Sequence, residues 1–111
     1  MLSRYVENSK EVGIASEEYW FKVVDMLQSN WALIDTTDSN ATIWFMSESS
    51  QVFDSLTYGS KAQAEDALRK NGFDQFALST HVHSFLSEPR RPFFYFPHPN
   101  GPIYSSGRFW S

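Results

Sequence analysis

Residues 31–46 read WALIDTTDSNATIWFM, and this stretch decides the fold class. From Trp31 the hydrophobic pattern has a period of two, which is typical of a β-strand. Asp38-Ser39-Asn40 is a turn-forming cluster, and a second β run, Thr42 to Met46, follows it directly. The connection is too short for a parallel crossover, so the two runs are predicted to pair as antiparallel neighbours.

More β runs follow the same pattern. Val52 to Tyr58 comes after four polar residues and completes a three-stranded meander. Phe93 to Phe96 reads as another strand, and a turn at residues 98–102 leads to a last short run, Ile103-Tyr104. Proline cannot donate to a β ladder, so the prolines beside these last two runs favour a hairpin at a sheet edge.

Two helices are predicted to pack on this sheet. Ser16 precedes Glu17 and Glu18 as an N-cap, and an apolar stripe follows it at helical spacing up to Ser29-Asn30. The stripe consists of Trp20, Val23, Val24 and Leu27. The second helix has the clearest local signals, because Ser60 and Gln63 match a capping box and Gly72 suits the left-handed position that ends a helix. Leu68 and Phe73 would then make the apolar contact of a Schellman motif.

Residues 74–88 fit a helix and a strand about equally, and we favour the helix. Residues 1–15 have no clear period and are expected to form a loosely attached arm. The chain is therefore predicted to be a single α+β domain over residues 1–111. We expect an antiparallel sheet of about five strands packed by two or three helices.

Composition limits the environment and the partners. The 111 residues contain no cysteine, so neither a disulfide framework nor a thiolate zinc site can form. No apolar run approaches 18 residues, and polar residues follow the first five residues in place of a secretory h-region. We therefore expect a water-soluble protein of the cytoplasm that has no membrane partner.

Aromatic residues are unusually frequent, at 17% of the chain. Ten Phe, five Tyr and four Trp are more than one small core needs, so some are expected on the surface, where such rings often anchor partners. The alternative is that all of them fill the core or cover its edges.

Charge is distributed unevenly along the chain. Residues 23–60 contain five acids and no Lys or Arg, whereas the residues after Glu88 contain three Arg and no acid. An acidic, aromatic sheet face could dock on a basic protein such as a nuclease toxin. The partner-binding residues predicted on this basis are Asp35, Asp38, Trp44 and Glu48. The alternative is a solvated face whose acids only maintain solubility.

Catalytic and metal motifs are missing from the sequence. It has no Gly-x-Ser-x-Gly elbow, no phosphate-binding loop and no His-Glu-x-x-His, so we predict no catalytic residue, no cofactor and no metal. The open alternative is a small metal-free nuclease or other hydrolase that uses His81, His83 or His98, with Arg90 or Arg91 stabilising the transition state.

Nucleic acid is not an expected partner. Arg90 and Arg91 lie close to the rings of residues 93–96, as on some surfaces that bind single strands. A net charge of −4 nevertheless removes the general attraction to phosphates that supports most such binding.

Two segments resemble small cytosolic immunity proteins of bacterial toxin–immunity systems, including those of contact-dependent growth inhibition. The first is SKAQAEDALRKNGF at residues 60–73, and the second runs from Arg91-Pro92-Phe93 through HPNGP at residues 98–102 to Arg108-Phe109-Trp110. The resemblance implies stoichiometric binding that neutralises one cognate toxin, often a nuclease, and it assigns no role to any residue. A structural subunit of a larger complex is a further alternative.

Overall fold

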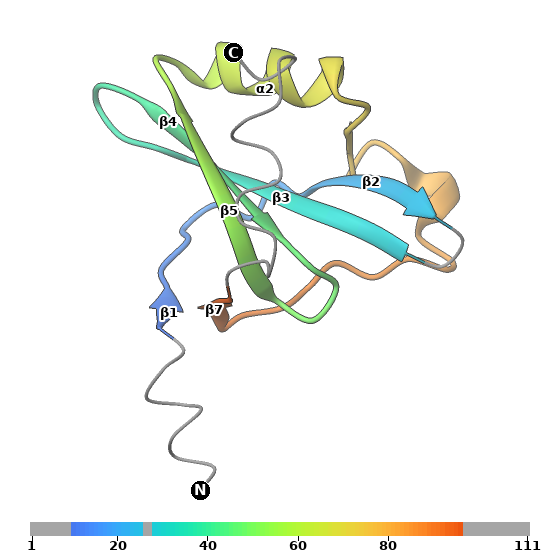
Figure 1. Ribbon diagram of the computed structural model, residues 1–111. Helices are drawn as coiled ribbons and strands as arrows, with labels where there is room; N and C mark the ends of the chain where they lie inside the picture. Colours follow the sequence, from blue (N-terminus) through green and yellow to red (C-terminus); the bar gives the residue numbers. More distant parts are fainter. Residues whose placement is uncertain (1–9, 26–27, 97–111) are drawn as a thin grey trace, which may run out of the picture.

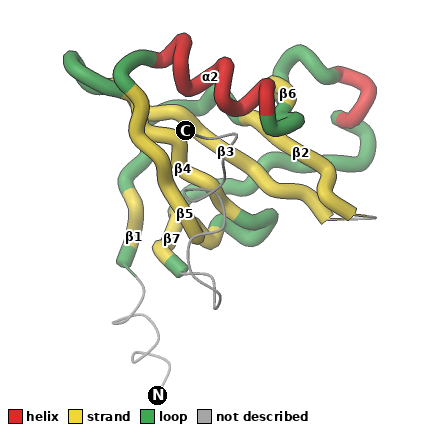
Figure 2. Tube along the Cα trace, turned by 45° about the horizontal axis from the view of Figure 1, so that its top comes forward, coloured by secondary structure: helices red, strands yellow, loops and turns green. Residues whose placement is uncertain are grey.

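The computed structural model describes residues 10–25 and 28–96, which form a seven-stranded mixed sheet with helix α2 across one face (Figure 1, Figure 2). The strand order is β1-β7-β5-β4-β3-β2-β6, and every neighbouring pair is antiparallel except β5 and β7. The strands are β1 (Glu11–Val12), β2 (Trp20–Asp25), β3 (Gln28–Thr36), β4 (Ala41–Met46), β5 (Gln51–Tyr58), β6 (Asp74–Gln75) and β7 (Phe93–Tyr95).

The prediction of a five-stranded antiparallel sheet with two or three helices is wrong. The described residues contain one α-helix, α2 (Lys61–Lys70), and one short 3₁₀ turn, η1 (Thr80–Val82). The sheet is mixed because the chain leaves β5, passes through α2 and a long connection, and returns with β7 parallel to β5. The predicted arm is also attached from residue 10 onward, since β1 pairs with β7 and Ile14 is buried.

The predicted helix from Ser16 to Asn30 is a β-hairpin, formed by β2 and the start of β3. Trp20 belongs to the core cluster under α2, and Phe21 to the cluster on the opposite face. Because Trp20 and Phe21 are buried on opposite faces, the start of the strand carries no apolar–polar alternation, and its apolar residues matched a helical stripe by coincidence. The β-branched pair Val23-Val24 also suits a strand better than a helix.

The prediction of a helix over residues 74–88 is wrong as well. This segment contains β6, then turns, then η1, and runs on to β7 without a regular element. Leu78 and Phe85, two apolar side chains that a helix would have used for packing, are 78% and 68% exposed. No continuous buried stripe exists here, so the backbone follows the turns that Ser79 and its neighbours stabilise.

The predicted meander is confirmed. Trp31 pairs with Met46 and Thr36 with Ala41 in the β3–β4 hairpin, and Ala41 pairs with Tyr58 in β4–β5. Asp54 pairs with Phe45 in regular register with Leu56 and is buried on the same face of β5, while the bulge between Val52 and Asp54 places Val52 in the other cluster. Asp54 therefore does not contribute to an acidic surface.

The helix predicted from the capping box is confirmed with both of its ends. The Ser60 hydroxyl accepts a hydrogen bond from the Gln63 N–H, 3.2 Å away. At the other end Gly72 has φ of +87°, and the Phe73 N–H donates to the Leu68 carbonyl at 2.9 Å. Leu68 and Phe73 are both buried in the cluster under α2, as the Schellman motif requires.

The sheet separates two hydrophobic clusters. One lies between the sheet and α2; the other lies on the opposite face, under residues 12–19 and the β6–β7 connection. In the second cluster Trp31 is fully buried, and Phe76, Tyr19 and Leu86 cover it from outside. The candidate site lies among these three side chains that cover Trp31.

The predicted hairpin over residues 98–104 lies outside the described residues. Within the part of the chain that the structure describes, no helix combines the length and the apolar character that crossing a membrane requires.

Candidate functional site

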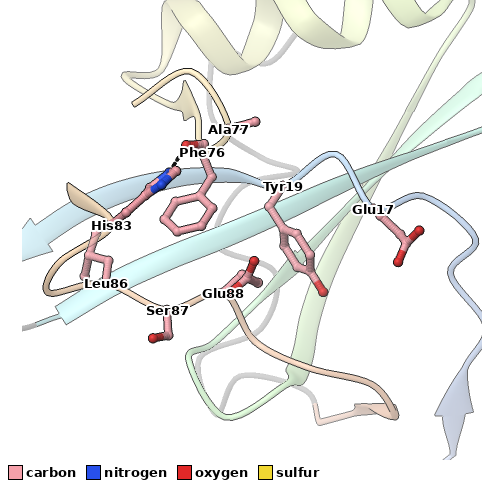
Figure 3. Close-up of a pocket in the computed structure, with 8 residues that line it drawn as sticks. All are labelled: Glu17, Tyr19, Phe76, Ala77, His83, Leu86, Ser87 and Glu88. Atoms are coloured by element: carbon pink, nitrogen blue, oxygen red, sulfur yellow. Dashed lines mark hydrogen bonds between the residues drawn. The ribbon is translucent and has the colours of Figure 1, made fainter. Parts of the chain in front are cut away.

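A pocket of about 440 Å³ opens on the face opposite α2, between the segment before β2 and the β6–β7 connection (Figure 3). It is lined by Glu17, Tyr19, Phe76, Ala77, His83, Leu86, Ser87 and Glu88. Figure 3 shows the Tyr19 ring between Glu17 on one side and Phe76 and Glu88 on the other. Two carboxylates and the rings of Tyr19, Phe76 and His83 therefore share one opening.

Tyr19 joins the two segments that form the pocket. Its hydroxyl donates a hydrogen bond to the Pro89 carbonyl at 2.6 Å, and its ring contacts Trp31 edge to face at 6.1 Å between centroids. Burial raises the pKa of Tyr19; the Arg91 charge opposes this rise, while Glu88 and Glu17 add to it. Tyr19 is therefore a neutral phenol at physiological pH, and its oxygen can still accept a hydrogen bond.

Phe76 and His83 form the opposite wall. The Phe76 ring packs on Trp31 at 5.1 Å between centroids. The backbone N–H of Phe76 donates to the Tyr19 carbonyl at 2.9 Å. The imidazole of His83 stacks on the Phe76 ring at 4.3 Å, and its Nε2 lies 2.7 Å from the Phe76 carbonyl oxygen. A carbonyl only accepts, so Nε2 carries a proton and the ring is fixed in place.

The charged side chains of the described lining are acidic. Glu17 and Glu88 line the pocket, and Arg91 stands beside it without belonging to the lining. The Arg91 guanidinium is 3.7 Å from the Glu17 carboxylate, with both side chains largely exposed, so this ion pair is weak. The same guanidinium donates to the carbonyls of Ile14 and Ser16, and these bonds hold it outside the pocket.

Asp35, a predicted partner-binding residue, has an internal role. Its carboxylate accepts hydrogen bonds from the backbone N–H groups of Ala15, at 3.1 and 3.2 Å, and of Ser16, at 2.9 Å. It also lines a shallower pocket of about 270 Å³, next to the ion pair of Lys61 with Glu18. Asp35 thus fastens the segment before β2 to the sheet.

The other three predicted residues do not gather around Asp35. Asp38 is exposed in the β3–β4 turn, and Glu48 is exposed in the β4–β5 turn at the opposite end of β4. Six strand residues separate the two turns, a span of about 20 Å. Trp44 is half-buried on β4 and packs against the second cluster. The structure therefore spreads the four residues over both ends of the meander.

The histidines are also separated. His83 lines the pocket, His81 is exposed and is not part of the lining, and His98 lies outside the described residues. Over residues 10–25 and 28–96, no three His, Asp or Glu side chains come together in a group that could hold a metal ion. Arg90 is exposed, whereas Arg91 is bound to backbone carbonyls.

Sequence reasoning missed Glu17, Tyr19, Phe76 and Glu88 as site residues. Their positions depend on two features of the fold: residues 20–25 form the strand β2 and not the predicted helix, and the β6–β7 connection folds back over the sheet. One signal could have indicated this connection, namely the apolar residues at 76, 78, 85 and 86 without a consistent period. Such a mixture is typical of an irregular segment that buries some rings and exposes others.

Comparisons with models of protein families, with curated proteins and with solved structures find no match to this chain.

Proposed function

We propose that this protein acts by binding another protein, as an immunity-type inhibitor that neutralises a basic toxin in the cytoplasm. The observation that carries the proposal is the pocket in which Tyr19 and Phe76 share one opening with Glu17 and Glu88. Aromatic rings provide contact area, and carboxylates favour a basic partner over an acidic one. The net charge of −4 would speed the approach of such a partner.

Exposed apolar side chains on the same connection support a binding surface. Phe85 lies between the pocket residues His83 and Leu86 in the sequence, and Leu78 follows the pocket residue Ala77. Large apolar side chains this exposed add nothing to the core, but they are suited to burial against a partner. Asp38 and Glu48 would contribute long-range attraction for a basic partner, and they would not lie at the centre of the contact.

The alternative of a nuclease is less well supported. Of the two histidines that the structure describes, His81 and His83, only His83 lines the pocket, and its Nε2 is engaged by a backbone carbonyl. Glu17 and Glu88 would repel a phosphodiester at this position, and the guanidinium of Arg91 is directed to carbonyls of the chain itself. A general acid and base could not act here without the substrate first overcoming this repulsion.

The proposal is tested with the protein encoded by the gene next to this one. The two purified proteins are mixed and analysed by size-exclusion chromatography with light scattering. We expect a one-to-one complex that forms more slowly as salt is added, because screening weakens the attraction between opposite charges. Two proteins that elute separately at micromolar concentration would count against an immunity role, and a larger assembly would favour a structural subunit.

Hydrolysis by the chain itself is measured in parallel. Purified protein is incubated with RNA and with DNA, and a variant with His81, His83 and His98 all changed to Ala is the control. We expect no cleavage by either protein. Cleavage that the triple change abolishes would replace the binding proposal with the nuclease.

A further inference from the structure

We propose that the pocket between Tyr19, Phe76 and Glu88 takes the guanidinium group of an arginine side chain from the partner. This proposal rests on the proposed function, since the arginine would belong to the neutralised protein. The binding itself is a property of the pocket and can be measured without any partner.

The size of the pocket suits a single side chain. Its volume of about 440 Å³ is near the lower end of the range for small-molecule sites, roughly 300–1,000 Å³. Leu86 and Ser87 are also part of the lining and are drawn below Phe76 in Figure 3. An extended side chain can enter with its charged end first, and its aliphatic part would lie along Leu86.

The walls provide the two kinds of contact that a guanidinium prefers. A planar cation stacks on aromatic rings, which here belong to Tyr19 and to Phe76, one face of which the His83 imidazole already covers. Its N–H groups can donate to the carboxylate of Glu88 and to the phenolic oxygen of Tyr19. The Tyr19 hydroxyl already donates its proton to the Pro89 carbonyl, so the lone pairs of its oxygen are available to accept a hydrogen bond.

Nothing within the described lining neutralises these acids from inside the pocket. Arg91 is the nearby cation, but its Nε and Nη2 donate to the Ile14 carbonyl and Nη2 also donates to Ser16. Its contact with Glu17, at 3.7 Å between exposed side chains, leaves the Glu17 carboxylate open to a second donor.

Arginine is preferred to lysine at this site. The planar guanidinium of an arginine can stack on the Tyr19 ring while its N–H groups donate to a carboxylate of the lining such as Glu88. An ammonium group is a compact, strongly hydrated charge that stacks less well and does not reach in two directions in one plane.

The test uses N-acetyl-arginine amide as the probe, added to ¹⁵N-labelled protein and followed by NMR. We expect saturable shift changes confined to residues around the pocket, with millimolar affinity. N-acetyl-lysine amide should bind about threefold more weakly, because an ammonium stacks less well on the rings. The citrulline analogue has the same shape without the charge and should not bind measurably. Equal shifts with citrulline, or shifts scattered over the surface, would overturn the proposal.

Two single changes locate the binding. Glu88→Gln should weaken binding of the arginine probe about fivefold, which corresponds to the loss of one partly exposed ion pair. Glu11→Gln removes the same charge from exposed β1, outside the pocket, and should have no effect. If Glu88→Gln does not fold, Glu17→Gln replaces it, since that side chain is 82% exposed. Equal binding of the probe by the pocket variant and the Glu11 control would contradict the site.

The two proposals can be told apart by their outcomes. If the arginine probe does not bind but the one-to-one complex with the partner forms, only this site is refuted. If the probe binds but no complex forms, the proposed function is refuted.

Discussion

Arg91 donates to the carbonyl oxygen of Ile14 through two nitrogens, Nε at 3.1 Å and Nη2 at 2.8 Å, although 77 residues separate them in the sequence. The same Nη2 donates to the Ser16 carbonyl at 2.8 Å. These bonds fasten the segment that carries Glu17 and Tyr19 to the end of the β6–β7 connection. The pocket therefore depends on Arg91, which does not line it.

Replacing Arg91 should destabilise the protein. Arg91→Ala removes charged donors from two carbonyls, and we expect the free energy of unfolding to fall by about 2 kcal/mol. Arg91→Lys should restore only part of this loss, because an ammonium cannot reproduce the forked geometry. Urea unfolding measures both variants. Arg90→Ala is the control, since the bond that the Ser50 hydroxyl donates to Arg90 uses the backbone carbonyl and survives the change. Equal stability of the two alanine variants would contradict this role.

Asp35 should act on stability before it acts on any partner. Asp35→Asn replaces the carboxylate that accepts from Ala15 and Ser16, and we expect a loss of about 1–2 kcal/mol. The Ala15 and Ser16 amides should exchange hydrogen roughly tenfold faster. Asp38→Asn, in the exposed turn, is the matched control and should change neither quantity. A change of Asp35 to Lys is thus a poor probe of an interface, and Asp38 is the cleaner acid to reverse, because the Glu48 carboxylate accepts from the Ser29 N–H at 3.4 Å.

Stability should fall at alkaline pH. The pKa of Tyr19 is raised from 10.0, mainly by burial, and the pKa of Tyr58 is raised by burial as well. The folded protein therefore holds these protons more tightly than the unfolded chain does. Their contribution is complete below pH 10 and is lost as the pH rises through the folded pKa values. The urea midpoint should therefore drop as the pH rises above 10.

Tyr19→Phe separates the contribution of Tyr19 from that of Tyr58. At pH 7 it should cost about 1 kcal/mol, because the Pro89 carbonyl loses its donor. Its urea midpoint should then fall less steeply above pH 10 than that of the unmodified protein. An identical alkaline slope in both proteins would show that Tyr19 does not contribute.

The exposed apolar residues should matter for binding and not for folding. Leu78→Ser and Phe85→Ser change side chains that are 78% and 68% exposed, so the free energy of unfolding should stay within about 0.5 kcal/mol. Binding of the partner should weaken, and calorimetric titration of the complex measures by how much. Thr80→Ala, at an exposed polar position of the same connection, is the control. Unchanged affinity in both serine variants would place the interface elsewhere.

Local signals in the sequence were sufficient for the meander and for α2. Strands of period two with short turns leave few alternatives, and the caps at Ser60 and Gly72 are nearly complete within their own segment. The strand β2 could not be recognised in this way, because Trp20 and Phe21 at its start are buried on opposite faces and its apolar spacing fits a helix. The parallel pairing of β5 with β7 is a long-range contact that no local pattern encodes.

The candidate site was still less accessible to sequence reasoning. Glu17 and Glu88 are 71 positions apart in the sequence, and long-range contacts bring them to one pocket, namely the packing of Tyr19 and Phe76 on Trp31 and the bonds of Tyr19 and Arg91. The predicted acids Asp38 and Glu48 are close in sequence yet lie at opposite ends of a strand. Proximity along an extended chain is a poor guide to proximity on a sheet, because each residue adds about 3.3 Å.

Stoichiometric inhibition is the most direct test of the central claim. The product of the neighbouring gene is first assayed for toxin activity, and this activity is then measured while the protein is titrated in at a concentration well above the dissociation constant. A binding inhibitor predicts a linear fall in activity that reaches zero at one molecule per toxin. Full toxin activity in the presence of excess protein, or loss of activity at a small fraction of that ratio, would contradict neutralisation by binding.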